Sequence, residues 1–333
     1  MNSHSFENNL AEYQKRFAEQ AARFFDDVLK RDKLQEEEKR LCEYVQRGGK
    51  RLRGYLTCLG YRLITDSVPD GVFDFSLGIE FGHAALLIQD DIFDEDKIRR
   101  SKNAFHITSG ADESAENHSS FERTSVREAI VLSNILITHA YDIMLTSSVP
   151  PDTKMSALSY LNSQAVRAGV GEFKDITIDS AQGLTQEDVA LLVDLKTTSY
   201  SLNATLVLGA HMAGASPKTL ESLKKVSYLL GQLYQMTDDY LSVLGESNKT
   251  GKGVSSDLSQ KKATYVTLLL RNRGMDSTSL DELKKSDILA IQQEISCLAQ
   301  QYRKDIDTLL ATLDFKCTDE LRSCIDFISN RSH

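Results

Sequence analysis

Five acidic side chains fall within seven residues of the chain and form its most evident metal-binding pattern: Asp90, Asp91, Asp94, Glu95 and Asp96. An apolar run precedes them, which indicates the partly buried end of a helix. On a helix, Asp90 and Asp94 lie one turn apart on the same face, with Asp91 beside them. Carboxylates this close repel one another, and a bound cation relieves the repulsion. Because only oxygen ligands are at hand, the segment predicts Mg²⁺ shared with substrate phosphates; a solvated acidic helix end is the alternative.

A second polar stripe follows about 150 residues later, inside an otherwise apolar helix. Its members recur at offsets of three, four and seven residues: Gln235, Asp238, Asp239 and Ser242. If the two clusters face each other in a helical bundle, they enclose a cavity that could hold several divalent ions and a diphosphate. Two unrelated solvated helix ends are the alternative.

Basic side chains that could bind such an anion occur in four places: Lys50–Arg51–Arg53, Arg99–Arg100, Lys196, and Lys252 with Lys261–Lys262. Lys196 lies between apolar stretches, so it needs an anionic partner. His83 precedes Asp90 by seven residues and therefore shares a face with the carboxylates. A hydrogen-bonded core histidine is the other interpretation of His83.

The composition is that of a soluble, mostly helical protein. Hydrophobic residues make up 41% of the 333 residues and charged residues 26%, and only four prolines occur. The net charge of −9 argues against general nucleic-acid binding. The five cysteines include no CxxC pair, and the N-terminal residues show no apolar signal core. We therefore expect a cytoplasmic setting and, as no apolar run reaches transmembrane length, no membrane span.

Helical periodicity predominates along the chain, and no strand alternation is strong enough to require a sheet. Helices are expected over residues 8–47, 55–64, the acidic segment, 126–146, 154–173, 185–212, 217–245 and the remainder to 328. Thr185 and Asp188 have the spacing of a capping box. Polar loops are expected at 107–125 and 246–260. The sequence thus predicts an all-α fold, in which a single-domain helical bundle of residues 1–333 surrounds a central active-site cavity.

Taken in order, these motifs resemble those of the trans-isoprenyl diphosphate synthases, also called polyprenyl synthetases. The segment Gly48–Arg53 is similar to the family's GGKRxR motif, and His83 with Asp90–Asp94 and Arg99–Arg100 is similar to its first aspartate-rich region. The remaining matches are Lys196-Thr197 to the KT motif, Gln235 with Asp238-Asp239 to the second aspartate-rich region, and Gly251–Thr264 to the closing loop. The resemblance therefore covers residues 48–264.

The resemblance implies a fold of the isoprenoid synthase type, a homodimer, and about three Mg²⁺ ions per site. It implies that Asp90, Asp94 and Asp238 ligate the metal, supported by Asp91 and Asp239. The residues it assigns to the allylic diphosphate are Arg99, Lys196, Lys252 and Lys262. Those it assigns to isopentenyl diphosphate are Lys50, Arg51, His83 and Arg100, with Arg53 in the same motif. Thr197 and Gln235 would line the path of the carbocation.

The implied reaction extends an allylic diphosphate by isopentenyl diphosphate to give an all-trans polyprenyl diphosphate. In the family, the residues just before the first aspartate floor the product tunnel. Here these are Leu86 and Ala85, and Phe81 lies one turn further away. Since the first two are not aromatic, we predict mainly geranylgeranyl diphosphate.

Three departures from the family pattern keep other functions open. Ser242 stands where a third aspartate is usual, Ser133-Asn134 stands where Gly-Asp is frequent, and the loop at 107–125 is long. They are compatible with a catalytically weak paralogue or regulatory subunit. A terpene cyclase of the same fold is the third hypothesis, but it would not need the second diphosphate site that Lys50, Arg51 and His83 indicate.

Overall fold

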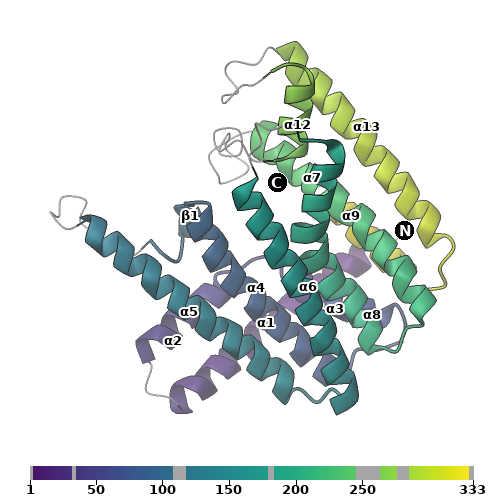
Figure 1. Ribbon diagram of the computed structural model, residues 1–333. Helices are drawn as coiled ribbons and strands as arrows, with labels where there is room; N and C mark the ends of the chain where they lie inside the picture. Colours follow the sequence, from purple (N-terminus) through teal and green to yellow (C-terminus); the bar gives the residue numbers. More distant parts are fainter. Residues whose placement is uncertain are drawn as a thin grey trace. The chain divides into compact units, whose positions relative to one another are not determined.

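A computed structural model describes residues 3–31, 35–107, 118–178, 184–244, 263–275 and 285–329 (Figure 1). These ranges are helical apart from short connections and one two-stranded ribbon, so the all-α prediction is confirmed. The chain forms two compact units. One consists of Glu7–Cys58 and Val68–Lys154, and the other of Met1–Phe6, Leu59–Ser67 and Met155–His333. The prediction of a single domain stays a prediction.

The unit built from Glu7–Cys58 and Val68–Lys154 carries the first aspartate-rich region, and we call it the first-cluster unit. Its elements are α1 (Ser3–Arg31), α2 (Gln35–Gln46), α3 (Leu52–Arg62, shared with the other unit), α4 (Asp70–Phe93), β1 (Ile98–Arg99), β2 (Lys102–Asn103) and α5 (His118–Thr146). Strands β1 and β2 pair antiparallel, with Ile98 opposite Asn103. α5 begins at His118, so the expected loop through Ser125 is wrong at its C-terminal end, while residues 108–117 lie outside the described ranges.

α4 is the central helix of the first-cluster unit and packs along α5 (Figure 1). Gly78 permits this packing, because a Cβ there would lie 2.7 Å from the carbonyl oxygen of Ala140. α4 and Thr124–Thr146 are long and apolar enough to cross a membrane, by length and composition only. The expectation that no apolar run reaches transmembrane length is therefore wrong for these two stretches, and the expected absence of a membrane span stays a prediction. In α4, 72% of the apolar window is buried inside the protein, as in the core helix of a globular protein.

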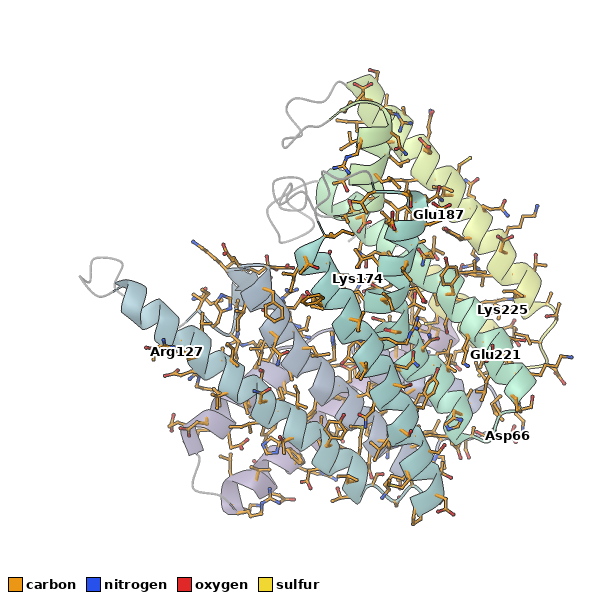
Figure 2. The ribbon with its side chains drawn as sticks, viewed as in Figure 1. Asp66, Arg127, Lys174, Glu187, Glu221 and Lys225 are labelled. Carbon is orange, nitrogen blue, oxygen red and sulfur yellow. The ribbon has the colours of Figure 1, made fainter. Side chains whose placement is uncertain are left out.

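The other unit carries the second aspartate-rich region, and we call it the second-cluster unit. Its elements are α6 (Pro151–Thr177), α7 (Gln186–Val193), the π-helical segment η1 (Asp194–Val207), α8 (Leu208–Met212), α9 (Pro217–Leu244), α12 (Tyr265–Asn272), α13 (Lys285–Leu310) and α14 (Thr318–Ser329). The capping box of Thr185 and Asp188 is present, as expected. Exposed charges such as Lys174 and Glu187 lie on the outside of this unit (Figure 2).

The core of the second-cluster unit forms around α9. Leu223, Val226, Leu230 and Leu233 recur at helical spacing in the sequence, and the apolar stripe that they form on α9 is buried. Val189, Met236 and Val266 belong to a buried cluster that joins α7, α9 and α12. The helix expected over 185–212 is continuous, but its middle is π-helical rather than α-helical. This wider turn changes the face on which the residues of η1 lie, which a 3.6-residue period does not predict.

Candidate active site

The C-terminal end of α4 presents the first acidic cluster. The Asp90 side chain is 31% exposed, whereas the Asp91 side chain is completely buried. Asp94 is the C-cap of the helix. Arg99 folds back over this end, and its Nε donates to Asp91 Oδ1 at 2.6 Å while its Nη2 lies 3.2 Å from Asp96 Oδ2. Arg99 is therefore held by the acidic cluster itself.

The oxygens of this cluster fit a hard divalent cation. Burial raises the pKa of Asp91 to about 6, although the hydrogen bond and charge of Arg99 oppose the shift. Asp91 Oδ2 is buried without a hydrogen-bond partner among the described residues. A buried carboxylate oxygen of this kind needs a positively charged neighbour. Within the described ranges, no three His, Cys, Asp or Glu side chains meet closely enough to form a complete metal site alone.

The Gly48-Gly49 turn brings the basic motif against Arg100. Both glycines have positive φ, at 91° and 109°. A Cβ on Gly49 would lie 2.7 Å from Nη2 of Arg100 and would displace this end of the arginine side chain, while the positive φ itself favours glycine. Arg100 Nη1 is buried without a hydrogen-bond partner in the described part of the chain. Lys50 is exposed beside this turn. The turn therefore lies beside a buried guanidinium nitrogen of Arg100 that can still donate a hydrogen bond to a ligand.

His83 belongs to the same basic group. Its Nε2 lies 2.8 Å from Nη1 of Arg53. Burial lowers the pKa of His83 well below its ordinary value, and the charges of Arg53 and Arg100 lower it further. The imidazole is therefore neutral and accepts the Arg53 hydrogen bond. His83 is thus a hydrogen-bonded histidine inside the basic group, which fits the alternative interpretation, and its part in substrate binding stays a prediction.

Arg51 points elsewhere, into the interior of the first-cluster unit. It is 6% exposed, its Nη2 donates to the carbonyl of Val45, and its Nη1 lies 3.8 Å from Glu80 Oε2. Its guanidinium also lies 4.3 Å from the centre of the Phe17 ring. Glu80 additionally accepts a 2.8 Å hydrogen bond from the backbone N–H of Gly54. The structure thus places Arg53 and Arg100 at the candidate site and Arg51 behind it.

Lys196 of η1 lies against two acids of α6 in the second-cluster unit. Its Nζ is 2.7 Å from Asp175 Oδ2 and 2.8 Å from Glu172 Oε2. Burial lowers the pKa of Lys196, but the two carboxylates outweigh burial and raise it above the ordinary value. The anionic partner expected for this lysine is therefore supplied by the chain. Sequence reasoning missed both acids, although their i, i+3 spacing beside Gly171 was a usable signal.

The rest of the KT motif joins the second acidic cluster through a hydrogen-bonded chain. Thr197 Oγ1 donates to Gln235 Oε1 at 2.7 Å, and Gln235 Nε2 donates to Asp239 Oδ1 at 2.8 Å. Asp239 Oδ2 also accepts from the backbone N–H of Tyr265 at 3.0 Å, and Asp239 is 2% exposed. Asp238 beside it is only partly buried. Tyr265 is the member of this network that the sequence interpretation did not identify.

Some predicted site residues lie outside what the structure describes. Lys252, Lys262 and most of the closing loop fall in the undescribed range 245–262. Ser242 lies within α9, but its side chain is not described. The two acidic clusters belong to different compact units, so their expected juxtaposition stays a prediction.

Of the three α4 residues expected to set product length, Phe81 and Ala85 are buried and Leu86 is exposed. Phe81 stacks on Phe25 with ring centroids 5.4 Å apart and meets Phe24 edge-on at 5.3 Å. Ala85 is fully buried, while Leu86 is 36% exposed. At the Ser133 departure, the hydroxyl accepts a 3.0 Å hydrogen bond from Gln89 of α4 and so supports the packing of α5.

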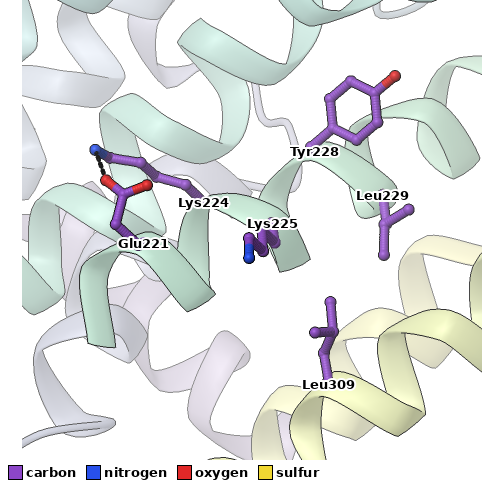
Figure 3. A pocket seen from close by; sticks show the side chains of 6 residues that line it. All are labelled: Glu221, Lys224, Lys225, Tyr228, Leu229 and Leu309. Carbon is purple, nitrogen blue, oxygen red and sulfur yellow. Dashed lines mark hydrogen bonds and ion pairs between the residues drawn. The ribbon is translucent and has the colours of Figure 1, made fainter. Parts of the chain in front are cut away.

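An open hollow of about 380 Å³ lies elsewhere in the second-cluster unit, between α9 and α13 (Figure 3). It is lined by Glu221, Lys224, Lys225, Tyr228, Leu229 and Leu309. Lys224 is already paired with Glu221 at 2.6 Å. None of these six residues belongs to the motifs, so the hollow is not part of the candidate active site.

The fold is helical, with acidic and basic motif residues in each of the two units, and comparison with known proteins identifies its class. A family model described as polyprenyl synthetase matches residues 35–298. The chain therefore belongs to the polyprenyl synthetase family and is a prenyltransferase, as the motifs indicated.

Proteins similar to this chain include isoprenyl and geranylgeranyl diphosphate synthases. The short chain isoprenyl diphosphate synthase of Methanocaldococcus jannaschii is 27% identical over 86% of this chain and 80% of its own. The geranylgeranyl diphosphate synthase of Methanosarcina mazei is 25% identical over 84% and 82%. Among solved structures, a geranylgeranyl pyrophosphate synthase from Corynebacterium glutamicum, complexed with isoprenyl diphosphate and magnesium, matches with a TM-score of 0.78. The two sequences are 21% identical, and the match covers 97% of this chain and 99% of the solved one. The match shows that the two proteins share a fold.

Proposed function

We propose that this protein is a Mg²⁺-dependent synthase that condenses isopentenyl diphosphate with an allylic diphosphate and yields mainly geranylgeranyl diphosphate. The observation that carries the proposal is the repeated arrangement of one partly exposed and one buried aspartate in each unit, with basic groups in both units. Asp90 and Asp238 are the more exposed members, and Asp91 and Asp239 are the buried ones. Asp90, Asp94 and Asp238 would hold the metal, which would neutralise charge on the leaving diphosphate.

The chain's own residues supply the remaining functions. Arg99 and Lys196 bind the allylic diphosphate, together with Lys252 and Lys262, and stabilise negative charge as its C–O bond breaks. The double bond of isopentenyl diphosphate then attacks the allylic cation, and the proton lost from the product goes to the departing diphosphate. The Thr197 hydroxyl and the Gln235 amide face this path as uncharged dipoles. A strong protein base is not required.

The second substrate site consists of the groups around the Gly48-Gly49 turn. Lys50, Arg53 and Arg100 would bind the diphosphate of isopentenyl diphosphate, and neutral His83 would orient Arg53. Arg51 supports this site indirectly, because its ion pair with Glu80 anchors the start of α3. The presence of this basic group favours chain elongation over cyclisation of a single substrate.

We also propose a homodimer, in a cytoplasmic setting. Five large apolar side chains of α6 are exposed: Met155, Val166, Val170, Phe173 and Ile176. Val166, Val170 and Phe173 recur at i, i+4 and i+7 and form one apolar stripe, whose exposure a second copy would relieve.

Product length is a separate proposal from the fold. Solved proteins of this fold include a heptaprenyl diphosphate synthase from Staphylococcus aureus with a TM-score of 0.75, so the fold alone does not set the length. Geranylgeranyl diphosphate is supported by the relatives of that name and by the position of Phe81, one turn beyond Ala85. The aromatic neighbours of Phe81 would make this end of the tunnel rigid.

The decisive experiment is incubation with labelled isopentenyl diphosphate, Mg²⁺ and each allylic primer in turn, followed by chromatography of the products. We expect primer-dependent incorporation and a main product of geranylgeranyl length. Asp90→Ala and Asp238→Ala should each lower turnover by at least about a hundredfold, the scale on which electrostatic stabilisers act. Near-normal turnover in both variants would refute the mechanism. Cyclic products, or no incorporation with any primer, would favour the cyclase or the regulatory subunit.

A further inference from the structure

The ammonium group of Lys196 contacts two carboxylates, although one carboxylate is enough to neutralise its charge. Glu172 and Asp175 are three residues apart on α6 and therefore share a face. Their oxygens lie 2.8 Å and 2.7 Å from Lys196 Nζ. The three groups together carry a net charge of about −1. A diphosphate that approaches Lys196 thus meets an excess of negative charge.

A neighbouring ion pair between α6 and η1 contains equal numbers of positive and negative charges. Arg167 of α6 meets Asp194 of η1 at 2.6 Å, one cation with one anion. The second carboxylate on Lys196 is therefore not a general feature of how α6 packs on η1. It adds repulsion between two acids that a single ion pair would avoid.

Backbone packing fixes where the Lys196 side chain starts. A Cβ on Gly171 would lie 2.5 Å from the backbone nitrogen of Lys196, so α6 and η1 are in direct contact there. Of the two acids, Asp175 is the shorter and the more buried, with its side chain 15% exposed. Glu172 is one methylene longer, 24% exposed, and loses more rotamer freedom when it is held. Glu172 is therefore the partner that can move away at the lower cost.

We propose that Asp175 positions Lys196, while Glu172 is a displaceable carboxylate that competes with the allylic diphosphate for the lysine. The inference rests on the proposed role of Lys196 in diphosphate binding. Before substrate enters and after diphosphate leaves, Glu172 satisfies an ammonium that would otherwise be half-buried with one partner. Competition of this kind weakens diphosphate binding and eases release of the product diphosphate.

The test compares Glu172→Gln and Asp175→Asn with a control that removes one charge elsewhere. The control is Glu187→Gln, an exposed acid of α7 (Figure 2). Binding of inorganic diphosphate in the presence of Mg²⁺ is measured by calorimetry on the full-length protein. Glu172→Gln should bind it about tenfold more tightly than the wild type, equivalent to about 1.4 kcal/mol. Glu187→Gln should match the wild type.

Kinetics and salt dependence separate competition from a structural effect. In Glu172→Gln, KM for the allylic substrate should fall, KM for isopentenyl diphosphate should stay constant, and kcat should not rise. Its advantage in diphosphate affinity should shrink in high salt, because added ions screen the repulsion that the substitution removes. Asp175→Asn should instead raise the allylic KM, since Lys196 loses its positioning partner.

Two outcomes would overturn the inference, and they are distinguishable. If Glu172→Gln binds inorganic diphosphate no more tightly than Glu187→Gln, Glu172 does not compete, and the proposed role of Lys196 is unaffected. If Lys196→Ala changes neither diphosphate affinity nor the allylic KM, the proposed role of Lys196 is wrong, and the inference fails with it.

Discussion

Arg51 and Arg53 are two residues apart in the basic motif, yet the structure gives them different tasks that mutation can separate. Arg51→Ala would leave Glu80, which is 1% exposed, without its cationic partner. Removing one member of a buried ion pair typically costs about 3–5 kcal/mol, and the 3.8 Å separation favours the lower end. At an unfolding entropy of about 2.1 cal/mol/K per residue, a loss of about 3 kcal/mol lowers the thermal midpoint of this chain by about 4 °C.

Arg53→Ala should have the opposite profile. The substitution removes the 2.8 Å contact with His83 and a cation proposed to bind isopentenyl diphosphate, and the imidazole left behind at this contact is neutral. We expect KM for isopentenyl diphosphate to rise at least about tenfold, with a loss of stability of no more than about 1 kcal/mol. Thermal unfolding followed by circular dichroism and steady-state kinetics measure the two effects separately.

A double variant tests the cause of the Arg51 effect. Arg51→Met combined with Glu80→Gln removes both charges but keeps an acceptor for the Gly54 N–H. It should recover at least about half of the stability lost in Arg51→Ala, because no uncompensated charge stays buried. Arg40→Met breaks an exposed pair with Glu128 and should cost less than about 1 kcal/mol. The reasoning is refuted if Arg51→Ala raises KM for isopentenyl diphosphate and leaves the thermal midpoint unchanged.

Three further substitutions address product length and metal affinity. Ala85→Phe should shorten the main product to farnesyl diphosphate, whereas Phe81→Ala should lengthen it by about one five-carbon unit, the span of one helical turn; chromatography of labelled products checks both, and an unchanged distribution in both would mean that the tunnel wall lies elsewhere. Phe81→Ala should also lose about 3 kcal/mol of stability, as a fully buried Phe is removed from its stack on Phe25. Ser242→Asp should lower the Mg²⁺ concentration for half-maximal activity, and an unchanged requirement would show that this position does not influence metal binding.

The sequence predicted the helices and the order of the motifs well, because both depend on local spacing. The apolar stripe from Leu223 to Leu233 and the capping box at Thr185 follow directly from side-chain periodicity and hydrogen-bonding chemistry, and both are present. The helix that starts at His118 was not predicted to start so early. Its first turns are polar, and a polar segment without apolar periodicity is equally typical of a loop.

Side-chain direction within the motifs was harder to predict. Arg51 has a positive φ of 51°, as an isolated residue after Lys50, and its side chain is buried, whereas Arg53 contacts His83. The motif contains all three basic residues and gives no indication of which one is buried. The acids that contact Lys196 lie on another helix, α6. Sequence spacing does not predict this contact, because it depends on the close packing of α6 on η1 at Gly171.

In both Asp-Asp pairs the second aspartate is buried and the first is more accessible, and this supports the proposed assignment of the metal ligands. In each pair the second aspartate is almost fully buried and held by neighbours: Asp91 by Arg99, and Asp239 by Gln235 and the Tyr265 backbone. A carboxylate with such bonds is fixed in orientation and fixes the backbone beside it. The first aspartate, Asp90 or Asp238, is the more accessible member. Each unit therefore holds one carboxylate in place beside a more accessible one, as we expect of the proposed metal ligands, although the two pairs lie on helices of different units with different neighbours.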